Sequence, residues 1–404
     1  MGTRPITYDR AMSKTVFLHV GLPKSGTSYV QKILTGNRER FAEAGLLFPG
    51  DAWVDQVRAV QDLRQLRMAP GKRRVVRGAW GRLAAEIAAW PGDAIVSMEW
   101  LGPASPEHIR VLVDDLSPAR VQVIFTVRDL TRTVPAAWQE FMQNRGEWTW
   151  QEFLEGVVAD DSWSTSAGAQ FWSQQDLKKL LGNWTSVVPR DQVHVVTLPH
   201  PGAGQEVLWQ RVCQVLGDAY QGYVLDDVAS NLSLGLESAE LMRRLNRLAR
   251  EEGVRGPLYH QVFKHRLAKD VLVRRKGKDS RLALPPAYHE WARRRAAQQI
   301  KELEASGVHV VGDPQELQPV LDASAGGQPG DVPAEVLLEI CLRALITMAR
   351  QWSPARGALT DLRSENARLR DRVQQFESSP GRTALGLYAR AARARVSAFR
   401  NDRG

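Results

Sequence analysis

The sequence predicts an α/β fold: a parallel sheet of the phosphate-loop type flanked by helices, with a helical and coiled-coil extension at the C-terminus. Three observations predict it. Short β-branched runs alternate with helical patterns over residues 15–320, a glycine-containing turn follows the first run, and apolar residues at three- and four-residue spacing dominate after residue 333. With 404 residues, 43% of them hydrophobic and 25% charged, the chain is long enough to bury a core and is not a disordered polyelectrolyte.

Five apolar runs predict the strands of the sheet. Residues 121–127 give the clearest signal, because the run is continuous and leads into a helical pattern around Trp138. Helical patterns also separate the other runs, which implies a parallel sheet covered on both faces. The other predicted strands are 15–20, 94–97, 193–197 and, at an edge of the sheet, 308–311.

Composition divides the chain into four parts. Residues 1–14 are expected to be disordered, 15–320 to fold as one domain, 321–332 to be a Gly- and Pro-containing linker, and 333–404 to be a helical tail. The tail begins with a helix over 333–352, which carries an apolar stripe that includes Leu337, Ile340 and Leu345. A coiled-coil seam of about two and a half heptads follows and predicts a homodimer through residues 357–378. Its core positions are Leu359, Leu362, Asn366, Leu369, Val373 and Phe376.

The positive charge is concentrated at the C-terminus. The whole chain has 54 Lys and Arg against 45 Asp and Glu, a net charge of +9, and residues 382–404 hold six arginines against one aspartate. This distribution disfavours a protein that coats nucleic acid with its whole surface. Residues 382–404 are interpreted as a basic amphipathic helix that contacts an anionic membrane surface or nucleic acid, or that is simply solvated.

Cysteine usage and hydropathy indicate the compartment. Cys213 and Cys341 each lie in an apolar helical segment, which excludes a disulfide scaffold and favours a reducing environment. Residues 16–22 are too short for a signal-peptide core, and no 18-residue apolar window is found. The prediction is therefore a cytoplasmic protein, peripheral to a membrane if the basic tail binds one. No His, Cys, Asp or Glu cluster has metal-ligand spacing, so no metal is expected.

The turn after the first strand carries the features of an anion site. Gly21 and Gly26 have the spacing of a nucleotide phosphate loop, and backbone amides at such a turn form an anion cradle with the helix N-terminus. A G-x-x-x-x-G-K-[ST] loop would carry lysine directly after the second glycine, where this chain has Thr27. The lysine comes earlier, at Lys24. This displacement keeps the phosphate-binding geometry and disfavours hydrolysis of a nucleoside triphosphate.

The string Pro23-Lys24-Ser25-Gly26-Thr27-Ser28 resembles the P-K-[ST]-G-T-[ST] loop of the sulfotransferases, and residues 15–313 are similar to the bacterial members of that family. The resemblance implies 3′-phosphoadenosine 5′-phosphosulfate (PAPS) as co-substrate. It implies that the loop holds the 5′-phosphosulfate, that Thr27 and Ser28 contact the 5′-phosphate, and that Lys24 neutralises charge as the sulfuryl group leaves.

Two further segments extend the resemblance. The strand 121–127 ends in Arg128, at the place of the family arginine that binds the cofactor's 3′-phosphate, although Leu130 and Ala136 replace the family's proline and serine. The missing hydroxyl removes a hydrogen bond of about 1 kcal/mol. A strand-end ion pair of Arg128 with Asp129 is the alternative. The segment 274–281 resembles the basic loop that closes over the 3′-phosphate, and a solvated surface loop is again the alternative; its candidate residues are Lys276, Gly277, Lys278 and Arg281.

Glu99 is the candidate general base. It follows the strand that precedes the arginine strand, the order found in sulfotransferases that use a glutamate base. Lys24, Glu99 and Arg128 each lie just beyond the C-terminal end of a predicted parallel strand, where ligands bind in open α/β sheets. A carboxylate that only stabilises a helix N-terminus is the alternative for Glu99. His19 and His194 are expected to be buried within strands.

The acceptor is not encoded by a motif. The prediction is a hydroxyl or amine of a carbohydrate, a glycolipid or a small molecule, with Trp100 and Trp138 as candidates for its binding wall. The basic run 71–77 fits an anionic acceptor or a surface segment over the cleft. Two other functions remain open: a P-loop kinase or NTPase with Asp129 as magnesium ligand, and a catalytically degenerate scaffold that acts through its coiled coil and basic tail.

Overall fold

The computed structural model describes residues 14–66, 75–204, 206–223, 233–254, 256–275, 277–321 and 327–378. Residues 1–13, Lys276 and the arginine-rich segment 382–404 therefore lie outside the described residues. The chain forms two compact units, one through Ile340 and one from Cys341. The catalytic candidates all belong to the first.

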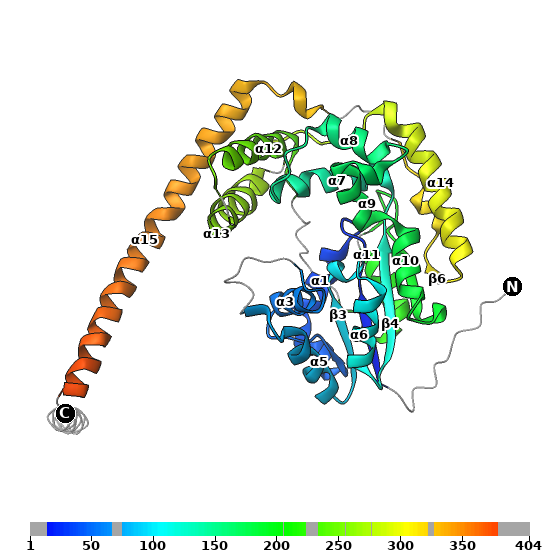
Figure 1. Cartoon of the computed structure of the whole chain (residues 1–404), viewed down its shortest axis with the longest axis horizontal. Coiled ribbons are helices and arrows are strands. Elements are labelled where there is room, and N and C mark those ends of the chain that lie inside the picture. The colour runs from blue at the N-terminus through cyan, green and yellow to red at the C-terminus, as the bar shows by residue number, and fades with distance from the viewer. Residues whose placement is uncertain are drawn as a thin grey trace, which may run out of the picture. The chain divides into compact units, whose positions relative to one another are not determined.

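A six-stranded parallel sheet forms the centre of the first unit (Figure 1). Its strand order is β2-β3-β1-β4-β5-β6, so the chain crosses over β1 between β3 and β4. This confirms the predicted α/β class, and 308–311 supplies the edge strand as expected. The two-residue strand at the other edge is too short to give a sequence signal. The strands are β1 (Thr15–His19), β2 (Leu46–Leu47), β3 (Asp93–Ser97), β4 (Arg120–Val127), β5 (Val193–Thr197) and β6 (His309–Val311).

Alternate residues of each strand point to opposite faces of the sheet, and each face packs on its own set of helices. Val16 and Leu18 of β1 join one apolar cluster, whereas Phe17 between them joins the other. The first face is covered by α3 (Trp53–Leu63), α5 (Ala79–Ala89), α6 (Pro106–Leu116), α10 (Leu177–Thr185) and α14 (His289–Ser306). The second is covered by α1 (Thr27–Gly36), α2 (Arg38–Glu43) and α11 (Glu206–Leu216).

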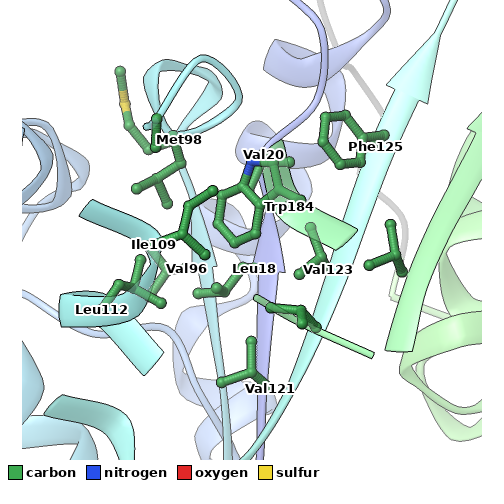
Figure 2. Close-up of a cluster of buried hydrophobic side chains, with 14 of the residues drawn as sticks. Leu18, Val20, Val96, Met98, Ile109, Leu112, Val121, Val123, Phe125 and Trp184 are labelled. Carbon is green, nitrogen blue, oxygen red and sulfur yellow. The ribbon is translucent and has the colours of Figure 1, made fainter. Parts of the chain in front are cut away.

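The first apolar cluster is centred on Trp184 of α10. Its indole is fully buried among Val20, Phe125 and Ile109 (Figure 2), and its ring nitrogen donates to the carbonyl of Gly102 at 3.0 Å. Burying an aromatic ring of this size stabilises the fold by about 2–3 kcal/mol. The same hydrogen bond ties α10 to the turn that follows β3, which is the turn that begins with Glu99.

The remaining helices lie beyond the sheet. The α-helices are α7 (Leu130–Gln143), α8 (Trp150–Val158), α9 (Ser166–Gln175), α12 (Leu236–Glu251) and α13 (Gly256–Leu258), and η5 (Tyr259–Leu272) is a π-helix. Short 3₁₀ turns are η1 (Glu99–Leu101), η2 (Ser162–Ser164), η3 (Arg190–Gln192), η4 (Asp218–Tyr220), η6 (Val273–Arg275), η7 (Pro286–Tyr288), η8 (Pro314–Leu317) and η9 (Pro329–Asp331). Among the described residues, no helix has the length and apolarity needed to cross a bilayer.

The long helix α15 (Ala334–Ser378) runs without interruption through both tail segments that the sequence distinguishes. It ends where the Ser-Ser-Pro-Gly stretch begins. Within the predicted apolar stripe over 333–352, Leu337 and Ile340 are buried, whereas Leu345, farther along the helix, is 57% exposed.

Candidate functional site

The loop between β1 and α1 has a backbone that only glycine tolerates at two positions. Gly21 and Gly26 have φ of 22° and 89°, and Gly26 caps α1 without a side-chain hydrogen bond. A Cβ on Gly26 would lie 2.4 Å from Leu208 Cδ2, and a Cβ on Gly21 would lie 2.4 Å from Thr27 Cγ2. Lys24 is also left-handed, with φ of 69°, which is uncommon for a lysine and costs about 1–3 kcal/mol. The loop is therefore held in a shape that the chain would not adopt by itself.

Four hydrogen bonds hold this loop from behind. The Ser25 hydroxyl is buried, bonds to the carbonyl of Leu22 and lies 2.7 Å from Thr126 Oγ1 on β4. Gln175 of α9 donates to the Pro23 carbonyl at 2.8 Å, and Arg128 donates to the Lys24 carbonyl at 3.2 Å. Ser25 is thus the one residue of the 23–28 string that does not line the cleft, and its side chain supports the loop.

A cavity of about 610 Å³, named here the central cavity, opens at the C-terminal edge of the sheet. Its wall includes Pro23, Gly26, Thr27 and Ser28, where the first amides of α1 have no partner within the helix. The wall also contains Lys24, Glu99 and Arg128, so the structure brings together the three residues that follow β1, β3 and β4.

Glu99 begins the turn after β3 and is half-buried. Burial raises the pKa of its carboxyl, and the nearby Glu140 adds to this, while a backbone hydrogen bond, the Gln31 amide and Lys24 partly oppose the rise. Gln31 of α1 donates to Glu99 Oε2 at 2.9 Å and also reaches the Ser97 carbonyl at 3.3 Å. The carboxylate is therefore held in one orientation and binds a proton more readily than an exposed glutamate does.

Lys24 pairs with Glu140 of α7, a residue that no sequence motif indicated. Lys24 Nζ lies 2.9 Å from Glu140 Oε2, and the two side chains are 26% and 40% exposed. An ion pair with this much solvent contact contributes little to stability. The ammonium group is thus kept at the cavity by a partner that an incoming anion could replace.

Arg128 is a half-buried cation whose charge has little compensation. Its Nε has no hydrogen-bond partner in the described part of the chain. Burial lowers the pKa of its guanidinium to about 10, Arg132 and Arg281 push in the same direction, and Asp129 opposes them. Asp129 itself is occupied, because it caps α7 by accepting from the Arg132 amide at 3.1 Å and pairs with the Arg132 side chain. The predicted alternative of a simple Arg128–Asp129 ion pair is therefore not what the structure shows.

The second cavity, of about 370 Å³, is named the arginine cavity and shares Arg128 with the central one. Gly277 and Arg281 line it, whereas Lys278 does not and Lys276 lies outside the described residues. Two acids fix this loop to the start of α12. Asp279 accepts from the Ser238 amide at 3.3 Å and pairs with Arg275 at 3.2 Å, and the Ser280 amide donates to Glu237 at 2.7 Å. The basic segment is thus built into the wall of a cavity.

The third cavity, of about 450 Å³, is named the tryptophan cavity and shares Pro23 and Glu99 with the central one. Trp100 and Trp163 line it and are 39% and 41% exposed. The prediction that Trp138 also lines the acceptor site is wrong. Its side chain is completely buried and donates to the Trp148 carbonyl at 3.1 Å. The helical periodicity around Trp138 did not reveal that this residue faces inward.

The two strand histidines are buried, as predicted. His19 lies 2.7 Å from Ser97 Oγ, and His194 lies 2.7 Å from Gln122 Oε1. Burial lowers the pKa of each to about 4, so both are neutral near pH 7. In the described part of the chain, no group of three or more His, Cys, Asp or Glu residues has the arrangement of a metal site.

No protein-family model and no curated protein matches the chain. Three solved structures are similar to parts of it. A sulfotransferase from Alicyclobacillus acidocaldarius is 14% identical with a TM-score of 0.37, over 62% of this chain and all of that one. The sulfotransferase domain of the Synechococcus PCC 7002 olefin synthase is 15% identical with a TM-score of 0.27, over 58% of this chain and 84% of that one. A sulfotransferase domain from the curacin biosynthetic pathway is 13% identical with a TM-score of 0.27, over 54% and 76% of the two chains. At these identities and TM-scores, the likeness does not assign the chain to a family.

Proposed function

We propose that this protein is a sulfotransferase that moves a sulfuryl group from PAPS to a hydroxyl or amine of a carbohydrate, glycolipid or small-molecule acceptor. One observation supports the proposal above the others. A phosphate-type loop with a lysine in its middle, a carboxylate of raised pKa and a half-buried arginine with little charge compensation meet in one cavity. This set suits a donor with two separate anionic groups and an acceptor that must lose a proton.

The donor would lie across the central and arginine cavities. The α1 amides, Thr27 and Ser28 would bind the 5′-phosphosulfate, since a helix N-terminus favours anions. Arg128, with its free Nε, would bind the 3′-phosphate together with Gly277 and Arg281 of the neighbouring loop. Lys276 and Lys278 belong to the same proposal by resemblance alone.

The reaction then needs charge neutralisation and one proton acceptor. The bond between sulfur and the bridging phosphate oxygen breaks while a bond forms from the acceptor oxygen or nitrogen to sulfur. Lys24 stabilises the negative charge that remains on the leaving 5′-phosphate, and the acceptor proton passes to Glu99. Glu99 suits this role better than Glu140, because Glu140 is paired with Lys24 and is more open to water.

The structure gives less support to the two alternatives. A magnesium-dependent NTPase would need a free acidic ligand, whereas Asp129 is buried against Arg132 and the α7 N-terminus. A degenerate scaffold would not need to retain an oriented Glu99 between two cavities. Cytoplasmic location and a membrane contact through 382–404 remain predictions from the sequence.

The deciding experiment compares two titrations of the full chain by calorimetry. We expect 3′-phosphoadenosine 5′-phosphate to bind and Mg-ATP to bind much more weakly. Binding of Mg-ATP alone would overturn the proposal. Incubation with ³⁵S-labelled PAPS and a lysate or lipid extract then identifies the acceptor as the molecule that gains label.

A further inference from the structure

The tryptophan cavity is lined by charged side chains, and two of them have no role in the proposed reaction. Glu99 is the only carboxylate among the described residues that line it, and it stands at the border with the central cavity. Two cations, Arg64 and Lys179, line the same cavity. The cavity therefore has an excess of positive charge on the side away from the donor.

Neither cation has a carboxylate partner in the described part of the chain. The Arg64 guanidinium donates to the carbonyls of Trp100 and Pro103, the latter at 3.1 Å, and its buried Nε has no partner. Lys179 Nζ lies 3.9 Å from the centre of the Trp163 ring, a cation–π contact at the exposed end of α10. Both charges are thus fixed in place by uncharged groups and remain available to an anion.

The apolar part of the lining is aromatic. Trp100 and Trp163 leave about two fifths of their surfaces exposed, which is unusual for rings of this size. Gln170, Ser173, Gln174 and Asn183 supply polar groups nearby. An occupant of this cavity would place flat apolar surface on an indole, an anionic group near Lys179 and Arg64, and a hydroxyl at Glu99.

We propose that the tryptophan cavity is the acceptor site and that it selects hydroxylated acceptors which carry both an anionic group and a ring, such as an acidic sugar. The inference rests on the proposed function in that it assigns the second substrate to this cavity. It goes beyond that function because it names the charge of the acceptor and the residues that select it.

Two probes that differ in one group test the selection. p-Nitrophenyl β-D-glucuronide and p-nitrophenyl β-D-glucoside share ring and hydroxyls, and only the first carries a carboxylate. Binding of each to the full chain saturated with 3′-phosphoadenosine 5′-phosphate is measured by calorimetry. We expect the glucuronide to bind at least tenfold more tightly at low salt and to lose this advantage as salt rises. Equal binding, or tighter binding of the glucoside, would overturn the inference.

Matched variants on α10 locate the effect. Lys179→Gln should bring the glucuronide affinity close to that of the glucoside, while Lys178→Gln, an exposed neighbour that lines none of these cavities, should leave it unchanged. An unchanged preference in Lys179→Gln would contradict the assignment. Because these measurements require no turnover, they are separate from the label-transfer assay. Selective binding of the glucuronide by a chain that binds Mg-ATP alone would refute the sulfotransferase proposal and keep the anion-selecting cavity.

Helix α15 carries a row of exposed apolar side chains that is separate from the cavities. Counting by heptads from Asn366 at an a position puts Val373, Leu345 and Leu338 at a, and Leu362 and Leu369 at d. All five of these apolar side chains are exposed, between 48% and 59%. Because α15 is a single helix, the heptad positions continue in the same register from Leu345 to Leu362.

We infer that a second copy of this chain covers the seam as a parallel, in-register coiled coil. Asn366 at a favours two strands. In the parallel arrangement Glu365 at g faces Arg370 at e of the other copy, which is an attractive pair.

Light scattering of the full chain tests this inference. We expect a dimer that Leu362→Asp with Leu369→Asp converts to a monomer, and that Ala367→Asp with Gln374→Asp leaves intact, because the latter pair is exposed away from the seam. Glu365→Arg should weaken the dimer and Arg370→Glu, added to it, should restore it. A monomer at every concentration, or a double charge reversal that does not restore the dimer, would refute the parallel coil.

Discussion

The two ends of the cleft hold ionisable groups on which burial acts in opposite directions. At one end, burial raises the pKa of Glu99 and favours its neutral, protonated form. At the other, burial lowers the pKa of Arg128 to about 10, which still leaves the guanidinium charged near pH 7. One end can therefore accept a proton, and the other carries a positive charge that a bound anion would stabilise. This difference suits the two roles proposed for the cavity, which are proton acceptance and anion binding.

The Glu99 end is tested by the isosteric change Glu99→Gln, for which we expect the largest effect. The amide keeps the shape but cannot accept the acceptor's proton, so the transfer rate should fall by roughly 10²- to 10⁴-fold. Affinity for 3′-phosphoadenosine 5′-phosphate, measured by calorimetry, should stay near the wild-type value. Glu140→Gln is the matched control and should retain most activity; the opposite ranking would make Glu140 the base.

Lys24 lies between the two ends, and Lys24→Met removes the charge while keeping the length of the side chain. The transfer rate should fall by roughly 10²- to 10³-fold, because the leaving phosphate loses its cation. Lys178→Met, on the exposed side of α10, is the control for a lost lysine. A wild-type rate in Lys24→Met would remove the lysine from the mechanism.

The Arg128 end is tested by Arg128→Met. Affinity for 3′-phosphoadenosine 5′-phosphate should fall by roughly 10- to 150-fold, since hydrogen bonds to charged groups contribute about 1.5–3 kcal/mol. The ligand-free variant should melt at the same or a higher temperature, because the partly buried charge has little compensation. Arg110→Met, an exposed position on α6, should change neither measurement. A less stable ligand-free variant with normal affinity would indicate a purely structural arginine.

The raised pKa of Glu99 also predicts how stability depends on pH. A carboxyl whose pKa is higher in the folded than in the unfolded state destabilises the folded state at any pH at which the group is ionised in both states. Glu99→Gln should therefore melt at a higher temperature than the wild type at pH 7.5, and the difference should shrink as pH falls towards 4.5. Thermal melts across that range measure it. A difference that grows on acidification would mean that the pKa is lowered instead.

The substitution Ala136→Ser also tests the Arg128 end of the cavity, and we expect it to have the smallest effect. It lines both the central and the arginine cavity, where the resemblance implies a serine. Ala136→Ser should tighten binding of 3′-phosphoadenosine 5′-phosphate by about fivefold, the equivalent of one hydrogen bond of about 1 kcal/mol. Weaker binding in the calorimeter would show that this part of the cavity has no room for the hydroxyl.

The sequence predicted the sheet and the shared location of three candidate residues, because both follow from strand periodicity. Lys24, Glu99 and Arg128 could be placed on one edge since the C-terminal ends of parallel strands coincide. Glu140 and Gln31 could not, because each comes from a helix whose orientation is set by packing. The error at Trp138 has the same cause. The tryptophan cavity is assembled from six separated segments, so no local pattern in the sequence predicts it.

The central and tryptophan cavities share few lining residues, and this affects how the protein could evolve. Among the described lining residues, only Pro23 and Glu99 belong to both cavities, so nearly every residue of the proposed acceptor site is separate from the proposed donor site. Substitutions on α9 and α10 could therefore change which acceptor the protein binds, while the residues that line the central cavity stay the same.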